Sequence, residues 1–569
     1  MELFVFIIAL VLILVIAFVS NAISMSKKKK IFIVKLKNNF GKFERKAPLN
    51  DRDVNYKGFF FKSVKGEDFI IDEITWNDLE GETLYSSLNN CYSSTGQEVL
   101  YYKLRKPVLE PSDIKIKEFN DKVSVVTENE KERIDLQLLY ATLGKTGKYS
   151  VFDYINLLGN VKKIPLFVFY IVWALYISVI AVAVCVPGCG YVAFGLIPLI
   201  IATAVFSFLQ RSTIEQYITS FEYVVRTVNT ADKFVKMNPK GFEKETEEIK
   251  RVRKELKGIK SSYLVFIKQS NRAGVTDILG AMLSLFNSLL LLDMFCFYKL
   301  LDTVRTRTDE FGELFELLGE NEIVLSVANF RKAFPEHCTP VFIDENRIKG
   351  ENLVHPLVAT CVSNSFEIKK GMLITGSNAS GKSTFLRTVL VNALLSETIY
   401  TATGKSFEMK PSVILSSMSL QDSLGDGESY YMTEIHSIKR ILAARSTNYH
   451  IICFLDEVLR GTNTVERVAA ATEILRNLSG DDILTFAATH DIELTHLLEN
   501  EYENYHFTEE IKGEEGKEDI FFSYKLMEGR CNTRNALFLL KLMGYPDEVV
   551  SRASALSEGF ITNGKWRNE

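Results

Sequence analysis

The sequence predicts a mixed fold: an α-helical core with transmembrane helices in the N-terminal half, and an α/β domain in the C-terminal part. Three observations support this prediction. Uncharged apolar segments long enough to span a bilayer lie within residues 1–210. Charged segments with apolar residues at helical spacing surround them and continue to residue 345. From residue 346 onward, short apolar runs typical of buried strands alternate with helical segments.

The composition limits the classes of function. A chain of 569 residues is too long for one hydrophobic core, so we expect several domains. The formal net charge of -4 gives no general positive field, and any contact with DNA is expected to be local. The eight cysteines lack the spacing of a zinc site or a disulfide framework, which favours a reducing cytosol. Cys185 and Cys189 flank a Pro-Gly turn, where a disulfide is the alternative to apolar packing.

The first apolar segment, Leu3–Ser20, carries no charge and is followed by Lys27–Lys30. Its length is near the lower limit for a transmembrane helix. Because the positive charges follow the segment, we predict an N-terminal anchor over residues 1–30 with its C-terminal side in the cytoplasm. A cleaved signal peptide is the alternative, but no basic residues precede the segment and no cleavage site is evident.

A second apolar stretch, Ile164–Phe208, predicts a transmembrane hairpin over residues 164–210. Two arms of about 20 residues are separated by Val186–Gly190, whose proline and glycines end helices. Lys162–Lys163 and Arg211 place basic residues at both outer ends of the hairpin, on one side of the membrane. Together with the anchor, the hairpin predicts a multi-pass protein of the cell membrane whose C-terminal half is cytoplasmic.

A further apolar run, Ile278–Leu292, is shorter and contains Ser284 and Asn287. We expect a buried helix of a soluble domain there, because a fourth span would move the C-terminal half out of the cytoplasm. Contact of residues 278–292 with the membrane is the alternative.

Residues 31–163, before the hairpin, are predicted to begin as strand or loop and to become helical from about Trp76, and residues 211–345, after it, are predicted to form the rest of a helical core. Apolar residues around a Thr-Gly break predict a helix pair within Leu84–Pro107. The charged stretch Ser212–Phe266 predicts a long exposed helix. A solvated face explains its basic residues more simply than a DNA contact does.

The strongest motif is a glycine-rich loop between an apolar strand at Met372–Thr375 and a following helix. Its spacing, GxxxxGKS, is that of a phosphate-binding loop, in which backbone N–H groups surround phosphate oxygens at a helix N-terminus. Lys382 is expected to reach the β- and γ-phosphates of ATP, and Ser383 to offer its hydroxyl to Mg²⁺. The predicted cofactor-binding residues are Gly376, Ser377, Asn378, Ala379, Ser380, Gly381, Lys382, Ser383 and Thr384.

Two further strands end in polar residues that suit phosphoryl transfer. The apolar run Ile451–Leu455 ends at Asp456, which is expected to hold Mg²⁺ with Ser383, and at Glu457, expected to polarise the attacking water. Another buried strand is followed by His490, at a position suited to sensing the γ-phosphate. Glu457 and His490 are therefore the predicted catalytic residues.

In this order, the three motifs resemble the ATPase domain of the MutS family. The matching segments are Thr375–Thr384 (TGxNxxGKST), Asp456–Thr462 (DE-x-x-RGT) and Ala488–His490 (ATH). Between them, Asp422–Glu434 resembles the family's signature loop, whose serine reaches the nucleotide of a partner subunit. The resemblance is strong over Leu353–Leu556 and faint over residues 84–318.

The resemblance implies an ABC/MutS-type P-loop NTPase domain over residues 346–569 that binds ATP and Mg²⁺ and forms a homodimer. Ser429 is the expected trans contact to the partner's nucleotide. The sequence departs from the family in having too few residues before the helical core for a mismatch-reading domain. It also has Leu459 where a glycine is common, and Ala379–Ser380 where Met-Gly is usual.

Together these features predict a membrane-anchored, MutS-like ATPase whose ATP-dependent dimer binds duplex DNA in a process related to mismatch repair. The alternative is an ATPase that remodels membrane or protein partners without binding DNA. A transporter is disfavoured, because three spans per chain and no charged residue within them leave little for a substrate pathway.

Overall fold

The computed structural model describes most of the chain and divides it into two compact units. The described residues are 2–50, 54–66, 68–157, 161, 163–185, 191–259, 286–377, 380–418, 430–460, 463–512, 519–531, 537, 540 and 543–563. The first unit, here called the helical unit, comprises Met1–Gly66, Tyr85–Tyr102 and Lys117–Ala333. The second, the mixed unit, comprises Glu67–Leu84, Lys103–Ile116 and Phe334–Glu569.

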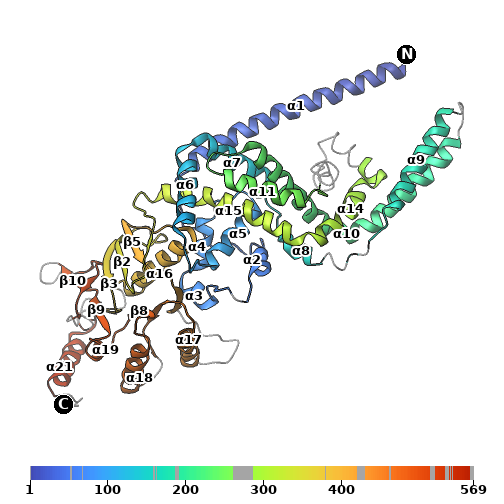
Figure 1. The fold of residues 1–569 in the computed structure, drawn as a ribbon. Helices are drawn as coiled ribbons and strands as arrows, with labels where there is room; N and C mark the ends of the chain where they lie inside the picture. The colour runs from blue at the N-terminus through green and yellow to red at the C-terminus, as the bar shows by residue number, and fades with distance from the viewer. Residues whose placement is uncertain are drawn as a thin grey trace. The chain divides into compact units, whose positions relative to one another are not determined.

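The helical unit contains only helices among its described residues (Figure 1). Those lying wholly within it are α1 (Glu2–Asn39), α2 (Gly58–Ser63), α7 (Glu130–Leu143), α8 (Val151–Leu157), α9 (Phe167–Cys185), α10 (Tyr191–Met237), α11 (Glu243–Glu255), α14 (Leu292–Thr306) and α15 (Thr308–Ala333). Most of α6 (Asp113–Glu128) also belongs to it. Helices α4 (Gly81–Leu88) and α5 (Ser94–Arg105) form a helix pair as predicted within Leu84–Pro107, but the predicted break is wrong, because the helices separate at residues 89–93 and Thr95 and Gly96 lie inside α5.

Two carboxyl groups are buried in the core of the helical unit. Glu322 on α15 accepts a hydrogen bond from the backbone N–H of Tyr92 (2.5 Å), and burial raises the pKa of Glu322 to about 7. Glu98 on α5 accepts hydrogen bonds from the backbone N–H of Phe59 (2.9 Å) and the hydroxyl of Ser150 (2.7 Å). Burial raises the pKa of Glu98 to about 8, so this side chain is largely protonated at neutral pH.

The prediction of one long exposed helix over Ser212–Phe266 is wrong, because α10 and α11 are separate helices. Asn238 and Gly241 adopt left-handed backbone conformations, with φ of 44° and 81°. Pro239 lies between them, and a proline cannot continue the hydrogen-bond ladder of a helix. Helix α11 also buries Ile249 and its neighbours on one face, so it is not exposed all round.

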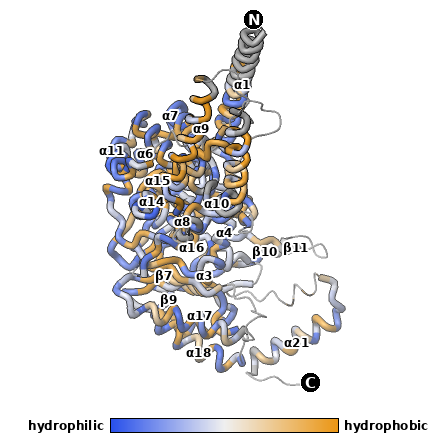
Figure 2. The backbone as a smooth tube through the Cα atoms, turned by 90° about the vertical axis from the view of Figure 1, so that its right-hand side faces the viewer, coloured by the Kyte–Doolittle hydropathy of each residue, from blue (hydrophilic) through white to orange (hydrophobic). Residues whose placement is uncertain are grey.

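Helices α9 and α10 form a helical hairpin at the position of the predicted transmembrane hairpin (Figure 1). Figure 2 shows apolar residues along both helices of this hairpin. Within the hairpin, the hydroxyl groups of Tyr176 and Thr203 lie 2.9 Å apart. The indole N–H of Trp173 donates to the carbonyl of Leu290 (2.8 Å), and Phe169 is fully buried. One face of the start of α9 thus packs against the helical unit, while Tyr170 and Ile171 are about half exposed.

The prediction of transmembrane helices is wrong. Among the residues that the structure describes, no helix has both the length and the apolar character that crossing a membrane requires. This finding contradicts the N-terminal anchor over residues 1–30, the transmembrane hairpin over residues 164–210 and the location in the cell membrane, and it leaves the predicted lipid partner without support. The apolar runs at residues 3–20 and in the second arm of the hairpin are parts of longer helices, because α1 continues through Lys27–Lys30 to Asn39 and α10 continues through Arg211 to Met237. Residues 278–285 of the further apolar run lie outside the described residues.

The mixed unit is organised around a six-stranded sheet, and its α/β content agrees with the prediction for the C-terminal part. In spatial order, the strands are β12 (Met527–Glu528), β9 (Tyr502–His506), β4 (Gly371–Thr375), β8 (Ile483–Ala488), β7 (Ile451–Asp456) and β6 (Val413–Ser417). All neighbouring pairs from β9 to β6 are parallel, and β12 is antiparallel to β9. Strands β4, β6 and β8 are buried along their whole length, as in parallel sheets covered on both faces.

The mixed unit also contains two smaller sheets and several helices. A four-stranded sheet contains β1 (Val341–Phe342), β5 (Ser406–Met409), β2 (Ile348–Leu353) and β3 (Asn364–Ile368), and a two-stranded sheet pairs β10 (Glu509–Lys512) with β11 (Asp519–Phe522). The helices are α3 (Glu73–Asp78), α16 (Lys382–Ile399), α17 (Tyr430–Ala444), α18 (Thr464–Asn477), α19 (Ile492–Leu497) and α21 (Asp547–Asn563).

Helix α3 comes from the N-terminal part of the chain but contacts strand β6. The carboxylate of Asp78, which is 1% exposed, accepts hydrogen bonds from the Ser416 hydroxyl (2.6 Å) and the backbone N–H of Met418 (2.9 Å). Arg440 on α17 pairs with Asp72, whose side chain caps the N-terminus of α3. Folding of the mixed unit therefore brings together segments that lie 338 residues apart in the sequence.

Candidate nucleotide-binding site

The glycine-rich loop leaves the carboxyl end of β4 and enters α16. Gly376 and Gly381 have φ of +141° and +107°, which side-chain-bearing residues rarely adopt. A Cβ atom at Gly376 would lie 2.7 Å from the carbonyl oxygen of Phe507. The backbone therefore requires both glycines of the predicted GxxxxGKS motif.

Lys382, the first residue of α16, folds back over this loop. Its ammonium group donates to the carbonyls of Gly376 and Ser377, both at 2.7 Å, and its side chain is buried. Burial lowers the pKa of Lys382, and the charges of Asp456 and Glu457 oppose this effect. Of the other predicted loop residues, Ser380, Ser383 and Thr384 lie at this turn, whereas Asn378 and Ala379 lie outside the described residues.

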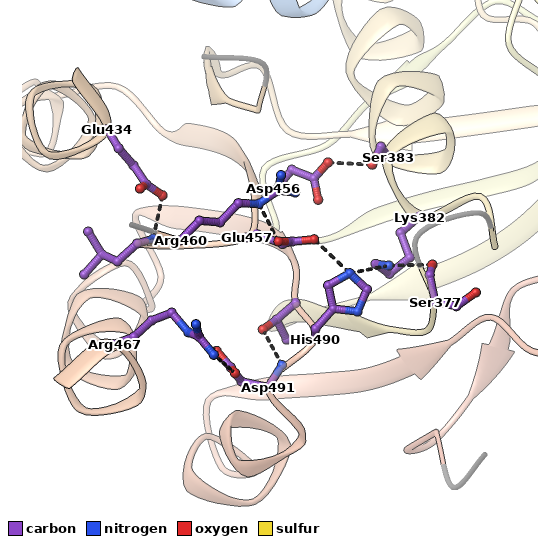
Figure 3. Close-up of polar contacts among 12 residues, drawn as sticks. Ser377, Lys382, Ser383, Glu434, Asp456, Glu457, Arg460, Arg467, His490 and Asp491 are labelled. Atoms are coloured by element: carbon purple, nitrogen blue, oxygen red, sulfur yellow. Dashed lines mark hydrogen bonds and ion pairs between the residues drawn. The ribbon is translucent and has the colours of Figure 1, made fainter. Parts of the chain in front are cut away.

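Ser383 and Asp456 meet beside the loop, as Figure 3 shows. The hydroxyl of Ser383 donates to Oδ2 of Asp456 at 2.5 Å, although the two residues follow different strands of the sheet. A hydroxyl and a carboxylate are hard oxygen donors of the kind that Mg²⁺ prefers beside nucleotide phosphates. The two residues predicted to hold the metal therefore suit Mg²⁺ in chemistry and in position.

Glu457 lies between His490 and Arg460 directly after β7 (Figure 3). Its Oε1 atom is 2.8 Å from Nε2 of His490, and its Oε2 atom pairs with Nε of Arg460. Burial acts to raise the pKa of Glu457, but the hydrogen bond and charge of His490, with the charges of Arg460 and Lys382, outweigh it and lower the pKa. Glu457 is thus held as a carboxylate, the form that a base requires.

His490 connects this carboxylate to the loop. Its Nε2 atom is 3.4 Å from Nζ of Lys382, so the imidazole lies between the two groups. The residue before it is held by the sheet, because the backbone N–H of Thr489 donates to the carbonyl of Ile374 (2.9 Å). The structure therefore brings Lys382, Ser383, Asp456, Glu457 and His490 together at the carboxyl ends of β4, β7 and β8.

Supporting residues that the sequence analysis did not single out hold the turns after β7 and β8. Arg467 on α18 forms a two-point ion pair with Asp491, at 2.6 and 3.0 Å, directly after His490. Glu434 on α17 accepts a hydrogen bond from the backbone N–H of Leu459 (2.5 Å). The sequence gives little indication of these roles, because Arg467, Asp491 and Glu434 are charged residues near the motifs and such residues usually belong to solvated surfaces.

A cavity of about 280 Å³ opens beside the loop, close to the size of small-ligand sites. It is lined by Val358, Thr360, Cys361, Val362, Asn364, Gly381, Thr384, Phe385, Thr388, Phe507 and Tyr524. Since Gly381 and Thr384 belong to the loop, this cavity has room for the part of a nucleotide that extends away from the phosphates. The predicted trans contact cannot be placed in the same way, because Ser429 lies outside the described residues.

Comparison with known families agrees with this geometry. Residues 372–560 match the family model of MutS domain V. The matched segment runs from β4 into α21 and contains the glycine-rich loop, Asp456, Glu457 and His490.

Similar curated proteins carry the same family name. The chain is 29% identical over 280 residues to the DNA mismatch repair protein MutS of Thermotoga maritima, covering 48% of this chain and 35% of that protein. It is 29% identical over 265 residues to MutS of Thermus thermophilus, covering 46% and 32%. For MutS of Staphylococcus haemolyticus the identity is 26% over 277 residues, covering 46% and 31%. The chain therefore spans about a third of the length of the curated relatives that it matches.

Proposed function

We propose that the mixed unit binds ATP with Mg²⁺ and hydrolyses it. The observation that carries this proposal is the convergence of Lys382, Ser383, Asp456, Glu457 and His490 at one edge of the parallel sheet. Phosphoryl transfer needs a positioned water and neutralised phosphate charge rather than covalent chemistry by the protein. These five side chains offer those two functions.

Each side chain has a distinct part in the proposed reaction. Lys382 would exchange its bonds to the loop carbonyls for phosphate oxygens, and Ser383 and Asp456 would hold the metal. Bound Mg²⁺ would neutralise charge that develops on the β- and γ-phosphate oxygens. Glu457 would orient the attacking water through its carboxylate, and His490 would fix that carboxylate while facing the terminal phosphate.

We further propose that two copies of the chain close over ATP and that the closed dimer binds duplex DNA. Support comes from the match to MutS domain V and from relatives that are named DNA mismatch repair proteins. Ser429 would contact the nucleotide bound to the partner. ATP would then favour the closed dimer, because a ligand stabilises the state that binds it best. With a formal net charge of -4, the chain would contact DNA through a local surface.

The deciding experiment measures the steady-state ATPase rate of the full chain with and without DNA. Homoduplex, mismatched and branched DNA are compared at low and moderate salt, and Lys382→Ala serves as the blank. Hydrolysis that Lys382→Ala abolishes supports the ATPase proposal, and its absence in the unaltered chain overturns it. Stimulation by DNA supports the DNA proposal, whereas hydrolysis with neither stimulation nor binding overturns it.

A further inference from the structure

The turn after β7 contains two residues in an unfavourable backbone conformation. Glu457 and Leu459 have φ of 56° and 62°, in the left-handed region that favours glycine. A side-chain-bearing residue adopts this conformation only at an energetic cost, so surrounding contacts must hold the turn in place. This turn carries the carboxylate proposed to orient water, and its geometry therefore matters for hydrolysis.

Glu434 supplies one of these contacts from a separate helix. Its side chain is only 4% exposed, and its Oε1 atom accepts the backbone N–H of Leu459 at 2.5 Å (Figure 3). Its other oxygen is buried and has no hydrogen-bond partner among the described residues. Burying a carboxyl group costs free energy, and here the hydrogen bond to the backbone of Leu459 offsets part of that cost. The same hydrogen bond restrains the turn.

The hydrogen bond between Glu434 and Leu459 links helix α17 to the residues on either side of Leu459 in the turn. Leu459 is followed by Arg460, whose Nε atom pairs with Oε2 of Glu457. A shift of the Leu459 N–H would therefore move Arg460 as well as the backbone of Glu457. On the other side, Glu434 lies in the second turn of α17, the helix that begins directly after Ser429.

We infer that Glu434 is a positioning residue that fixes the strained turn Glu457–Leu459 and couples its geometry to helix α17. This inference rests on the proposed ATPase function and deepens it. A change in the position of α17 would then reach Glu457 through Glu434 and the backbone of Leu459.

The test measures kcat, KM and ATP affinity for Glu434→Ala and Glu434→Gln. Loss of the contact should lower kcat about tenfold in Glu434→Ala, which corresponds to ~1.4 kcal/mol. ATP affinity and KM should stay within about threefold of the unaltered chain, because the contact between Glu434 and Leu459 does not involve the glycine-rich loop. Glu434→Gln keeps an acceptor oxygen and should lie between the alanine variant and the unaltered chain. Lys439→Ala, an exposed change on the same helix, is the control.

Rescue by a second substitution separates positioning from a general loss of stability. Positive φ at Leu459 costs a leucine more than a glycine, but Leu459 is also buried in the core, so the rescue compares Glu434→Ala with Glu434→Ala carrying Leu459→Asn, whose side chain tolerates positive φ, and partial recovery of kcat is expected. The inference is overturned if kcat in Glu434→Ala equals that of the Lys439→Ala control, or if kcat and ATP affinity fall together without rescue. If Glu434→Ala fails to fold, the same comparison is made with Glu434→Gln, and an unchanged kcat there overturns the inference. Absence of ATPase activity in the unaltered chain would instead overturn the proposed function.

Discussion

Nε2 of His490 lies 2.8 Å from Oε1 of Glu457, although the two residues follow different strands. Parallel pairing of β7 with β8 places Asp456 opposite Ala488, so the residues that follow both strands meet at one edge of the sheet. The imidazole also faces Nζ of Lys382. One side chain therefore contacts both the group expected to bind phosphate and the group expected to orient water.

Replacing His490 should impair hydrolysis and the discrimination of ATP from ADP. We expect His490→Ala to lower kcat by about tenfold to a hundredfold, as for the loss of one charge-assisted hydrogen bond. ATP affinity should approach ADP affinity, because the residue would no longer face the terminal phosphate. Nucleotide titrations and steady-state kinetics measure both effects, with His496→Ala as an exposed histidine control. An unchanged preference for ATP would contradict the sensing role.

Glu457→Gln should trap bound ATP. The amide keeps the size of the side chain but cannot act as a carboxylate, so we expect kcat to fall about a hundredfold or more. ATP binding should persist, and light scattering after addition of ATP and Mg²⁺ should show a longer-lived dimer. Glu466→Gln, an exposed carboxylate on α18, is the matched control. A hydrolysis rate equal to that of the control would remove Glu457 from the proposed mechanism.

Ser429→Ala should slow hydrolysis while leaving ATP binding by the monomer largely intact. Mixing Ser429→Ala with Lys382→Ala gives a sharper test, because a mixed dimer contains one site with both residues present. Activity should therefore rise on mixing above that of either variant alone. Ser446→Ala, beyond the other end of α17, is the control. Equal loss of binding and hydrolysis, or no recovery on mixing, would rule out a trans contact.

The buried carboxyl of Glu98 should make the chain less stable as pH rises. Its pKa in the folded chain is about 8, above the ordinary value of 4.5, so the folded state binds more protons between these values. Stability is then fully present below pH 4.5 and is lost as pH rises toward 8. Glu98→Gln should remove up to ~1.4 kcal/mol per pH unit of this slope.

Chemical denaturation of the full chain at several pH values between 5 and 9 measures this slope. Glu322 contributes in the same direction, because its pKa is also raised, to about 7, so Glu98→Gln should reduce the slope without abolishing it. An exposed substitution, Glu128→Gln, supplies the comparison. A slope identical in both variants would mean that Glu98 is ionised in the folded chain.

The sequence was sufficient to predict the parts of the site that depend on local spacing. A strand, a glycine-rich loop and a helix fix the position of Lys382 within a few residues. Asp456 and His490 each directly follow or end an apolar strand, and parallel strands bring such ends to one edge. The positions of these residues can therefore be predicted from short segments of sequence, without knowledge of distant contacts.

Features that depend on distant contacts were missed or predicted wrongly. The contact between Asp78 and Ser416 joins residues 338 positions apart, and neither residue is conspicuous in the sequence. Glu434 looks like one more charge on an amphipathic helix, because only the fold reveals its bond to Leu459. The apolar hairpin of α9 and α10 was taken for a membrane element, since hydropathy alone cannot register internal contacts such as that of Trp173.

The docking of α3 on β6 has a practical consequence for dividing the gene into fragments. A fragment that begins at Phe334 would encode every residue matched to MutS domain V, yet it would lack Asp78 and Asp72. The Ser416 hydroxyl and the Met418 N–H would then lose their buried acceptor, at about 1–3 kcal/mol for each unsatisfied group. Exchanging this domain between proteins as a self-contained cassette would therefore require carrying an N-terminal piece of the chain along with it.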